Sequence, residues 1–502
     1  MRVRAAPDRL VTAPRIVVVG AGIAGLSAAR ALRRAAPGAD VVVLEASHRV
    51  GGLVETERTA EGFVLEHGAD CLLTTKPHGV AAVRALGLER ELATGGGARG
   101  TYVARGATLV PMPPILGPID LAAAWSFLRS PLLSGAGKAR ALLEPFVPAR
   151  RCADDESIAD FAVRRFGREV ATAVLAPLLG GLYGADPRAL SMHACLPRLA
   201  ELERAHGSLV RAMRHAARAR RRRASAGEAV LPHVVTLRRG MGSLTDAAAR
   251  GLGVELGVSV RAVDRRGRGF GLVTARGTLA CDAVVLATPA WAVPALVEAW
   301  APDLAGDVAA IAHKRLDVVT LAWPRGAVAR RLDGTGWLRA AGDPRPTAAC
   351  TWASEKWRER APAGAFLVRS VLAEPAADDG ELVAAARADL RDLLGIGAEP
   401  VLVRVRRLPR ATPIYAVGHG CVVERIRTRA AEAGPFALAG NAYGGVGIPD
   451  CIASGEAAAG AVLRALARTP AAGRHEASGD GDRSGRPWPI AAEPRQPPAA
   501  RA

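Results

Sequence analysis

The chain has 502 residues with a formal net charge of +19, and 50% of the residues are hydrophobic. This length allows a large buried core and predicts two or three domains. Only 4% of the residues are aromatic and none alternates with a basic stripe, which disfavours a nucleic-acid partner. No run of about 18 apolar residues occurs, so we expect no membrane-spanning helix.

Charge and cysteine usage narrow the class further. Arginine supplies nearly all of the positive charge. We interpret the basic surface as solvated, and an anionic membrane surface or an anionic substrate is the functional alternative. The seven cysteines are scattered, with no CxxC or Cys/His ligand spacing. This pattern predicts reduced thiols, a cytoplasmic protein and no metal site.

The N-terminal segment has the pattern of one βαβ unit. Residues 16–19 form a β-branched run typical of a buried strand, and residues 20–25 form a glycine-rich turn. An amphipathic helix is expected over 26–36, followed by a second buried strand over 41–44. The acidic residue Glu45 ends this strand.

The turn, GAGIAG, fits the dinucleotide-binding pattern G-x-G-x-x-G. Gly20 permits the tight turn, Gly22 lets the backbone approach a pyrophosphate, and Gly25 lets helix and strand pack closely. The N-terminus of the helix offers free N–H groups and a positive dipole end to phosphates. Glu45 follows at the position where a carboxylate accepts hydrogen bonds from ribose hydroxyls. Together these residues predict a dinucleotide site.

Further along, the pattern changes twice. A mainly helical region ends in a dense arginine run over 211–223, which we interpret as a solvated helix end and loop. Strand-like runs then dominate, and a glycine-rich turn near residue 440 opens a last helix. The strand-like runs are 318–323, 366–372 and 401–406, with one helix expected over 380–394.

Two segments resemble the flavin amine oxidase superfamily. EASHRVGG, residues 45–52, is similar to its extended fingerprint, in which Arg49, Gly51 and Gly52 would line the pyrophosphate and flavin. AGNAYGGVGIPDCIASGEAAAGAV, residues 439–462, is similar to its C-terminal FAD segment. There a glycine turn runs into a helix N-terminus, which stabilises negative charge on a reduced flavin. The resemblance adds Gly440, Gly447, Ile448 and the backbone of Val260 to the cofactor site.

Within that superfamily, four segments resemble the protoporphyrinogen and coproporphyrinogen III oxidases. They are 61–77, 176–209, 407–419 and 446–455, and the similarity runs from about residue 15 to 465. The resemblance implies that Arg99 holds a substrate propionate and that Gly181 lets the substrate approach the flavin.

The resemblance also implies the fold, of α/β and α+β class. A Rossmann-type FAD-binding domain is joined to a mixed-sheet substrate domain and to a helical domain that resembles a membrane-binding one. The expected ranges are 15–80, 225–295 and 419–468 for the FAD-binding domain, 81–210 for the helical domain, 296–418 for the substrate domain, and 469–502 for a disordered tail.

The implied activity is an FAD-dependent porphyrinogen oxidase of haem biosynthesis. It would carry out the six-electron oxidation of protoporphyrinogen IX or coproporphyrinogen III to the porphyrin, with O2 as acceptor and hydrogen peroxide as product. No general base stands out, which suits hydride transfer driven by the flavin. No cysteine or histidine has a flavin-linkage setting, so we expect non-covalent FAD.

Several points stay open at this stage. The alternatives are an amine oxidase, a carotenoid desaturase, or an FAD-binding scaffold without turnover. The choice between the two porphyrinogens is also open. Residues 121–146 combine apolar, aromatic and basic side chains, and predict a peripheral contact with the cytoplasmic membrane. A homodimer is compatible with the sequence.

Overall fold

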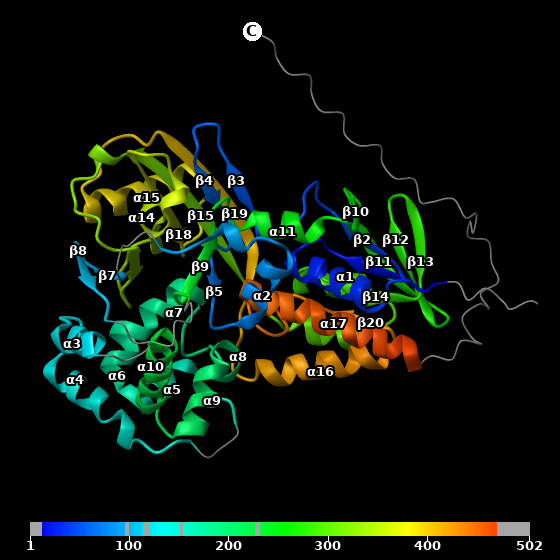
Figure 1. Ribbon diagram of the computed structural model, residues 1–502, viewed down its shortest axis with the longest axis horizontal. Helices are drawn as coiled ribbons and strands as arrows, with labels where there is room; N and C mark the ends of the chain where they lie inside the picture. Colours follow the sequence, from blue (N-terminus) through cyan, green and yellow to red (C-terminus); the bar gives the residue numbers. More distant parts are fainter. Residues whose placement is uncertain are drawn as a thin grey trace, which may run out of the picture.

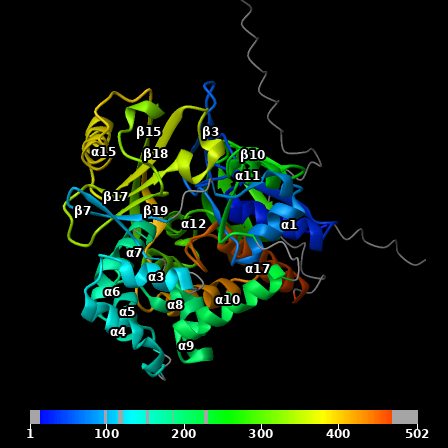
Figure 2. The same cartoon turned by 60° about the vertical axis from the view of Figure 1, so that its left-hand side comes forward.

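The computed structural model describes residues 13–95, 100–113, 121–150, 154–183, 185–225 and 231–468. Figure 1 shows two lobes built on sheets, with a group of helices beneath the left-hand lobe. Arg99 and the predicted tail 469–502 lie outside the described residues. Figure 2 shows the same arrangement from a second direction, with α3 to α10 gathered below the left-hand lobe.

A five-stranded parallel sheet forms the centre of the right-hand lobe, in the order β10-β2-β1-β14-β20. The β-branched runs expected to be buried strands supply its middle, where Val18 of β1 pairs with Val43 and Val285. These runs suit a parallel sheet covered on both faces. The strands are β1 (Arg15–Val19), β2 (Asp40–Glu45), β10 (Gly253–Leu256), β14 (Ala283–Leu286) and β20 (Phe436–Leu438).

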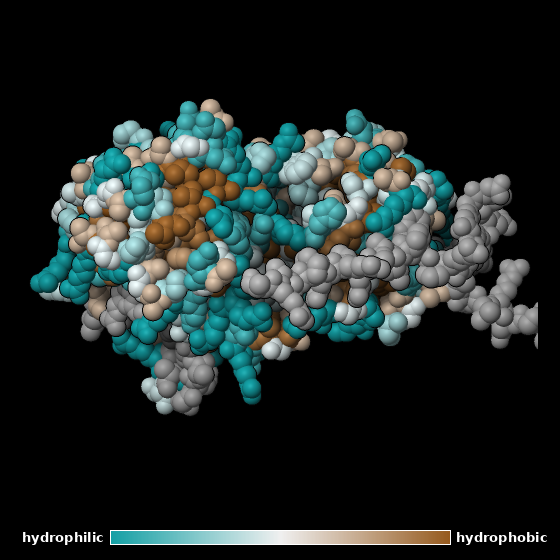
Figure 3. All heavy atoms as spheres, turned by 90° about the horizontal axis from the view of Figure 1, so that it is seen from above, coloured by the Kyte–Doolittle hydropathy of each residue, from teal (hydrophilic) through white to brown (hydrophobic). Residues whose placement is uncertain are grey.

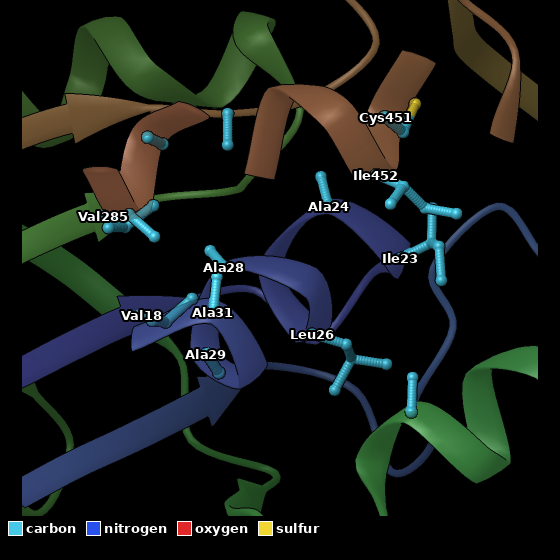
Figure 4. Close-up of a cluster of buried hydrophobic side chains, with 14 of the residues drawn as sticks. Val18, Ile23, Ala24, Leu26, Ala28, Ala29, Ala31, Val285, Cys451 and Ile452 are labelled. Carbon is cyan, nitrogen blue, oxygen red and sulfur yellow. The ribbon is translucent and has the colours of Figure 1, made fainter. Parts of the chain in front are cut away.

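Helices α1 (Ile23–Ala35) and α17 (Ile448–Arg468) pack closely together on one face of this sheet. Small residues make the close contact possible, because a Cβ at Gly455 would lie only 2.1 Å from the carbonyl oxygen of Ala24. Figure 4 shows Ala24 and Ala28 pointing from α1 toward α17, while Leu26 points away from it. Helices α1 and α17, which are far apart in the sequence, therefore belong to one unit.

The other face of the parallel sheet is covered by a three-stranded antiparallel sheet and by helices. Turns at Gly267 and Gly277, which have φ values of +55° and +113°, join its strands. Each of these glycines follows an arginine in the sequence. The elements are β11 (Val260–Arg266), β12 (Gly269–Thr274), β13 (Gly277–Cys281), α12 (Val293–Val297), α13 (Pro302–Ala309) and α16 (His419–Glu432).

A seven-stranded mixed sheet forms the left-hand lobe, in the order β19-β15-β18-β17-β16-β7-β8. Helix α15 (Asp379–Leu394) covers one face; it begins after Asp378, whose side chain accepts from the N–H of Glu381, and ends at left-handed Gly395. The strands are β7 (Tyr102–Arg105), β8 (Thr108–Pro111), β15 (His313–Pro324), β16 (Gly336–Arg339), β17 (Thr347–Trp352), β18 (Ala365–Leu372) and β19 (Leu402–Pro413).

The helical unit packs around its own apolar core. A buried ion pair between Arg165 and Glu144 joins its helices, and Glu144 also accepts from the N–H groups of Leu209 and Val210, which open α10. Its helices are α3 (Leu121–Arg129), α4 (Gly135–Leu142), α5 (Ile158–Phe166), α6 (Arg168–Val170), α7 (Ala176–Tyr183), α8 (Met192–Cys195), α9 (Pro197–His206) and α10 (Leu209–Ser225).

Two observations refine the expected pattern. The range 81–210 contains the strands β7 and β8, which extend the seven-stranded sheet. The arginine run 211–223 is helical throughout, within α10.

Within the described ranges, no helix is long and apolar enough to cross a membrane, and no group of three or more metal-ligating side chains is placed to hold an ion. Seen from above, hydrophilic residues cover most of the surface and a hydrophobic patch lies on the left-hand lobe (Figure 3).

Candidate dinucleotide and substrate site

The glycine turn lies at the carboxyl end of β1, where it enters α1. Gly20 has φ +104°, and a Cβ there would lie 2.7 Å from the carbonyl oxygen of Ala287. A Cβ at Gly25 would lie 1.9 Å from the carbonyl oxygen of Gly20. Gly22 is the N-cap of α1, and a Cβ there would meet no described atom within 4 Å. Two of the glycines are therefore needed by the fold, and the third faces open space at a helix N-terminus.

Glu45 ends β2 beside this turn. Its Oε2 accepts from the N–H of Ala21 at 2.7 Å, and its Oε1 accepts from the N–H and hydroxyl of Ser47 at 2.9 and 2.8 Å. A carboxylate has about four acceptor positions, so these three bonds leave room for one more donor. The carboxylate thus holds the turn in shape, with one acceptor position left for a ribose hydroxyl.

The second glycine pair packs against the first turn. The N–H of Gly51 donates to the carbonyl of Ala21 at 2.8 Å, and Gly51 and Gly22 form an isolated parallel bridge. A Cβ at Gly52 would lie 3.3 Å from Gly22 Cα. Arg49 donates to the carbonyl of Gly52 at 2.8 Å and pairs with Glu55 at 2.9 Å. The segment EASHRVGG therefore packs against the first glycine turn and bonds to its backbone.

Val260 and the C-terminal turn lie at the same edge of the sheet. Val260 begins β11, directly after a segment whose Val258 N–H donates to the carbonyl of Glu45 at 2.9 Å. On the other side of β1, Gly440 follows β20 with φ +141°. The N–H of Gly447 donates to Asp450 at 3.1 Å, and α17 begins at the buried Ile448.

Residues 286–288 lie between the two glycine turns. Gly20 packs against Ala287, and a Cβ at Gly440 would lie 4.0 Å from the carbonyl oxygen of Thr288. Thr288 Oγ1 is buried and has no hydrogen-bond partner among the residues that the structure describes. Ligands of open parallel sheets bind at the carboxyl ends of the strands. An open Gly22, an unsatisfied hydroxyl and two helix N-termini at that edge fit an extended anionic dinucleotide such as FAD.

Of the two predicted substrate residues, only Gly181 lies within the described residues. Gly181 of α7 packs against the sheet face opposite α15, since a Cβ there would lie 2.5 Å from Leu338 Cδ2. The neighbouring Gly180 faces open space, because a Cβ there would meet no described atom within 4 Å. Sequence reasoning chose Gly181, yet Gly180 is the glycine with free volume beside it.

A charged cluster on the face of the seven-stranded sheet opposite α15 was not predicted from the sequence. Lys356 Nζ lies 2.7 Å from Asp70 Oδ2, and Arg369 donates to the carbonyl of Gly68 at 2.8 Å. Burial alone would raise the pKa of Asp70, but Lys356 and Arg369 outweigh it and hold this pKa well below its usual range. Burial raises the pKa of the adjacent Cys71 thiol to about 12. Two features of the sequence could have indicated this cluster: lysine is rare in the chain, and Asp70 and Cys71 lie together in the motif HGADC.

This cluster borders both units. A Cβ at Gly68 would lie 1.7 Å from the carbonyl oxygen of Leu53, directly after the second glycine pair. Arg369 lies on the face of β18 opposite α15, since its neighbours Val368 and Phe366 belong to the core under α15. On the same face, Arg406 pairs with Glu55 at 2.7 Å. The cluster therefore lies where the seven-stranded sheet meets the dinucleotide site.

Comparison with known proteins agrees with this arrangement. Residues 23–463 match the family described as flavin containing amine oxidoreductase. The chain is 36% identical to a coproporphyrinogen III oxidase of Propionibacterium freudenreichii, over 93% of this chain and 94% of that protein. It is 30% identical to a coproporphyrinogen III oxidase of Bacillus subtilis, over 90% and 98% of the two chains.

Solved structures show the same fold. A crystal structure from Exiguobacterium sp. 255-15, assigned as a protoporphyrinogen oxidase, has a TM-score of 0.77 and 27% identity, with 91% of this chain and 99% of that chain covered. Cyclohexylamine oxidase from Brevibacterium oxydans shares the fold at 17% identity and a TM-score of 0.63, covering 91% and 100%. The chain belongs to the flavin containing amine oxidoreductase family.

Proposed function

We propose that this chain is an FAD-dependent porphyrinogen oxidase that converts coproporphyrinogen III to coproporphyrin III. The observation that carries the proposal is the similarity to coproporphyrinogen III oxidases across nine-tenths of the chain. Three two-electron oxidations each remove a hydride and a proton from the macrocycle. Three molecules of dioxygen receive these electrons and protons as three molecules of hydrogen peroxide. Bound FAD would supply the hydride acceptor.

The glycine turns would hold FAD from both ends. Gly22 and the N-terminus of α1 would bind the pyrophosphate, with Gly20, Gly25, Gly51 and Gly52 shaping the backbone around it. Glu45 would accept from a ribose hydroxyl, and the backbone of Val260 would contact adenine. Gly440, Gly447 and Ile448 would contact the flavin half, and Arg49 would orient the second glycine pair.

We propose that FAD is held without a covalent bond. A cysteine that links to flavin must act as a thiolate, and burial raises the pKa of both Cys71 and Cys451 to about 12. Burial therefore disfavours, at both positions, the thiolate that a covalent link would need.

The substrate carries carboxylates, so its site needs cations at the edge of an apolar space. Lys356 and Arg369 carry two positive charges against the single negative charge of Asp70. This excess positive charge suits a propionate, in addition to the contact proposed for Arg99. The face of the sheet around Leu338, with Gly180 and Gly181 opposite it, would supply the apolar wall.

The test is to assay coproporphyrinogen III and protoporphyrinogen IX side by side with the purified, FAD-loaded chain. Porphyrin fluorescence and peroxide are followed together. We expect coproporphyrinogen III to be oxidised faster, with three peroxides per porphyrin. Faster oxidation of protoporphyrinogen IX would reassign the substrate. A chain that binds FAD but oxidises only amines or carotenoids would refute the proposal.

We also propose a peripheral membrane contact through the helical unit. Five large apolar side chains are exposed there, by 45–78%, on α3, at the end of α4 and just beyond it: Trp125, Leu128, Leu142, Leu143 and Phe146. We call this set the apolar face. Two of its members, Leu128 and Leu142, also line a cavity of about 170 Å³ whose other lining residues are apolar as well. Exposed apolar patches of this kind mark protein or membrane contacts.

Not every apolar residue of the range 121–146 belongs to the apolar face. Leu132 and Leu133 are buried in the core of the helical unit, and Phe127 is partly buried there. Arg129 stacks on the ring of Trp125 at 4.4 Å, which places a cation beside the aromatic anchor. An anionic membrane surface fits this combination.

A further inference from the structure

A pair of stacked rings lies behind the C-terminal glycine turn. Tyr415 and His419 come from the connection between β19 and α16 and from the start of α16. Their ring centroids are 4.1 Å apart, with 15° between the planes. Both side chains are buried, with exposed fractions of 2% and 6%.

The rings bond to the backbone of the turn at three points. The hydroxyl of Tyr415 donates to the carbonyl of Asn441 and accepts from the N–H of Gly445 at 2.8 Å. His419 Nε2 lies 2.9 Å from the carbonyl oxygen of Ala442, so this nitrogen carries the proton. The turn begins and bends again at glycines with positive φ, Gly440 and Gly445. Its shape thus depends on these side chains.

The same connection is fixed to the helical unit. The carbonyl of Tyr415 accepts from the N–H of Ser191 at 2.8 Å. The N–H of Gly418 donates to Asp155 Oδ2 at 2.8 Å, and the N–H of Val417 donates to the carbonyl of Ala189 at 3.1 Å. Tyr415 therefore has its backbone anchored in the helical unit and its hydroxyl in the turn.

The strand order indicates which half of a dinucleotide this turn would meet. In the order β2-β1-β14-β20, Glu45 ends β2 and Gly440 follows β20 on the opposite side of β1. A ligand with its adenosine at Glu45 and its pyrophosphate at Gly22 extends its other half toward Gly440 and α17.

We propose that Tyr415, supported by His419, is a positioning residue for the flavin half of FAD. It would hold the turn 440–447 in the shape that binds and tie that shape to the helical unit. This inference rests on the proposed function, because it needs FAD to be the ligand. It predicts an effect confined to one half of the cofactor.

The test compares FAD with ADP, which carries the adenosine and pyrophosphate without the flavin. Both are titrated into the full-length apoprotein, with FAD followed by flavin fluorescence and ADP by calorimetry. Tyr415→Phe keeps the ring but leaves one N–H and one carbonyl of the turn unsatisfied. We expect FAD affinity to fall about 10- to 100-fold and ADP affinity to stay within about twofold. We also expect a shift in the visible spectrum of the bound flavin.

Tyr102→Phe is the matched control. Tyr102 is a buried tyrosine of β7 in the core under α15, and its hydroxyl donates to Asp333, so the variant also removes one buried tyrosine hydrogen bond but lies outside the turn. Its loss should leave both affinities unchanged. A second variant, His419→Phe, keeps the stack and removes only the bond to Ala442, and should weaken FAD binding about 3- to 10-fold.

The outcomes separate this inference from the function on which it rests. A parent chain that binds ADP but no FAD would refute the proposed function. A parent that binds FAD, with unchanged affinity in Tyr415→Phe, would overturn the positioning role. Equal losses for FAD and ADP would do the same, since they indicate general destabilisation. If Tyr415→Phe does not fold, an unchanged FAD affinity in His419→Phe would also overturn it.

Discussion

Replacing Gly22 should separate cofactor binding from folding. The Cβ position of Gly22 meets no described atom within 4 Å, and its φ of −67° suits any residue. We therefore expect Gly22→Val to fold with an unchanged melting temperature as apoprotein. The valine would fill the space expected for the pyrophosphate. Losing two charge-assisted hydrogen bonds of about 1.5–3 kcal/mol each corresponds to roughly a 100- to 10,000-fold loss of FAD affinity.

Gly25→Val provides the contrasting case within the same motif. Its Cβ would lie 1.9 Å from a backbone oxygen, so helix or strand must move, and overpacking of this kind costs about 1–3 kcal/mol or more. This variant should lower the melting temperature of the apoprotein itself. The assay is thermal unfolding without ligand, followed by FAD titration. If Gly22→Val bound FAD like the parent, the fingerprint would not be the cofactor site.

Three further predictions concern the cofactor and the substrate. Acid precipitation of the holoprotein should release free flavin into the supernatant, and yellow colour left in the pellet would indicate a covalent bond. Arg99→Ala should raise the KM about tenfold to hundredfold with a smaller change in kcat, because a distant propionate contact contributes mainly uniform binding; an unchanged KM for both porphyrinogens would remove Arg99 from the site. Gly181→Ala should change stability little, because the atom that its Cβ would meet at 2.5 Å is the end of the flexible Leu338 side chain, which can move aside. Gly180→Ala should raise stability slightly, because it removes a helix glycine at a position where a Cβ meets no described atom within 4 Å, and it should alter the KM if the substrate lies there.

Local patterns were sufficient for the elements of the dinucleotide site. The β-branched run 16–19 is β1, the run 41–44 lies within β2, and the helix expected over 380–394 is α15. Each depends on periodicity and on nearby caps or glycines, which are local properties. The helix expected from residue 26 begins earlier, at Ile23, because Gly22 itself serves as its N-cap.

Long-range pairing was beyond the sequence alone. Tyr102–Arg105 pairs in parallel with β16, more than 200 residues away, and a short hairpin within a mainly helical region gives no signal of that partner. The same limit applies to the charged cluster. Asp70, Lys356 and Arg369 come together only because the loop after β4 (Val64–Glu66) meets β18 in space. Burial of a charge pair depends on such contacts and not on spacing along the chain.

The membrane proposal depends on how much apolar surface can leave water. Full burial of a large apolar side chain contributes about 1.5–3 kcal/mol, so five that are roughly half exposed offer roughly 5 kcal/mol together. Each cation near an anionic surface adds about 1 kcal/mol. Trp125 and Phe146 are the most suitable positions to change, because they are 57% and 78% exposed and their loss should not disturb the core.

We expect the Trp125→Glu/Phe146→Glu double variant to bind phosphatidylglycerol-containing vesicles more weakly at low salt, as measured by sedimentation. The binding constant should fall by at least about 30-fold, the factor for about 2 kcal/mol. Val401→Glu/Val403→Glu is the control. It adds the same charge at two exposed valines at the edge of the seven-stranded sheet, with 65% and 38% exposure. This control should sediment like the parent. Equal losses in both double variants would indicate that only net charge matters, because both become less basic by the same amount. A parent chain that stays in the supernatant at every salt concentration would refute the membrane contact, since neither the apolar face nor the basic charge would then suffice for binding.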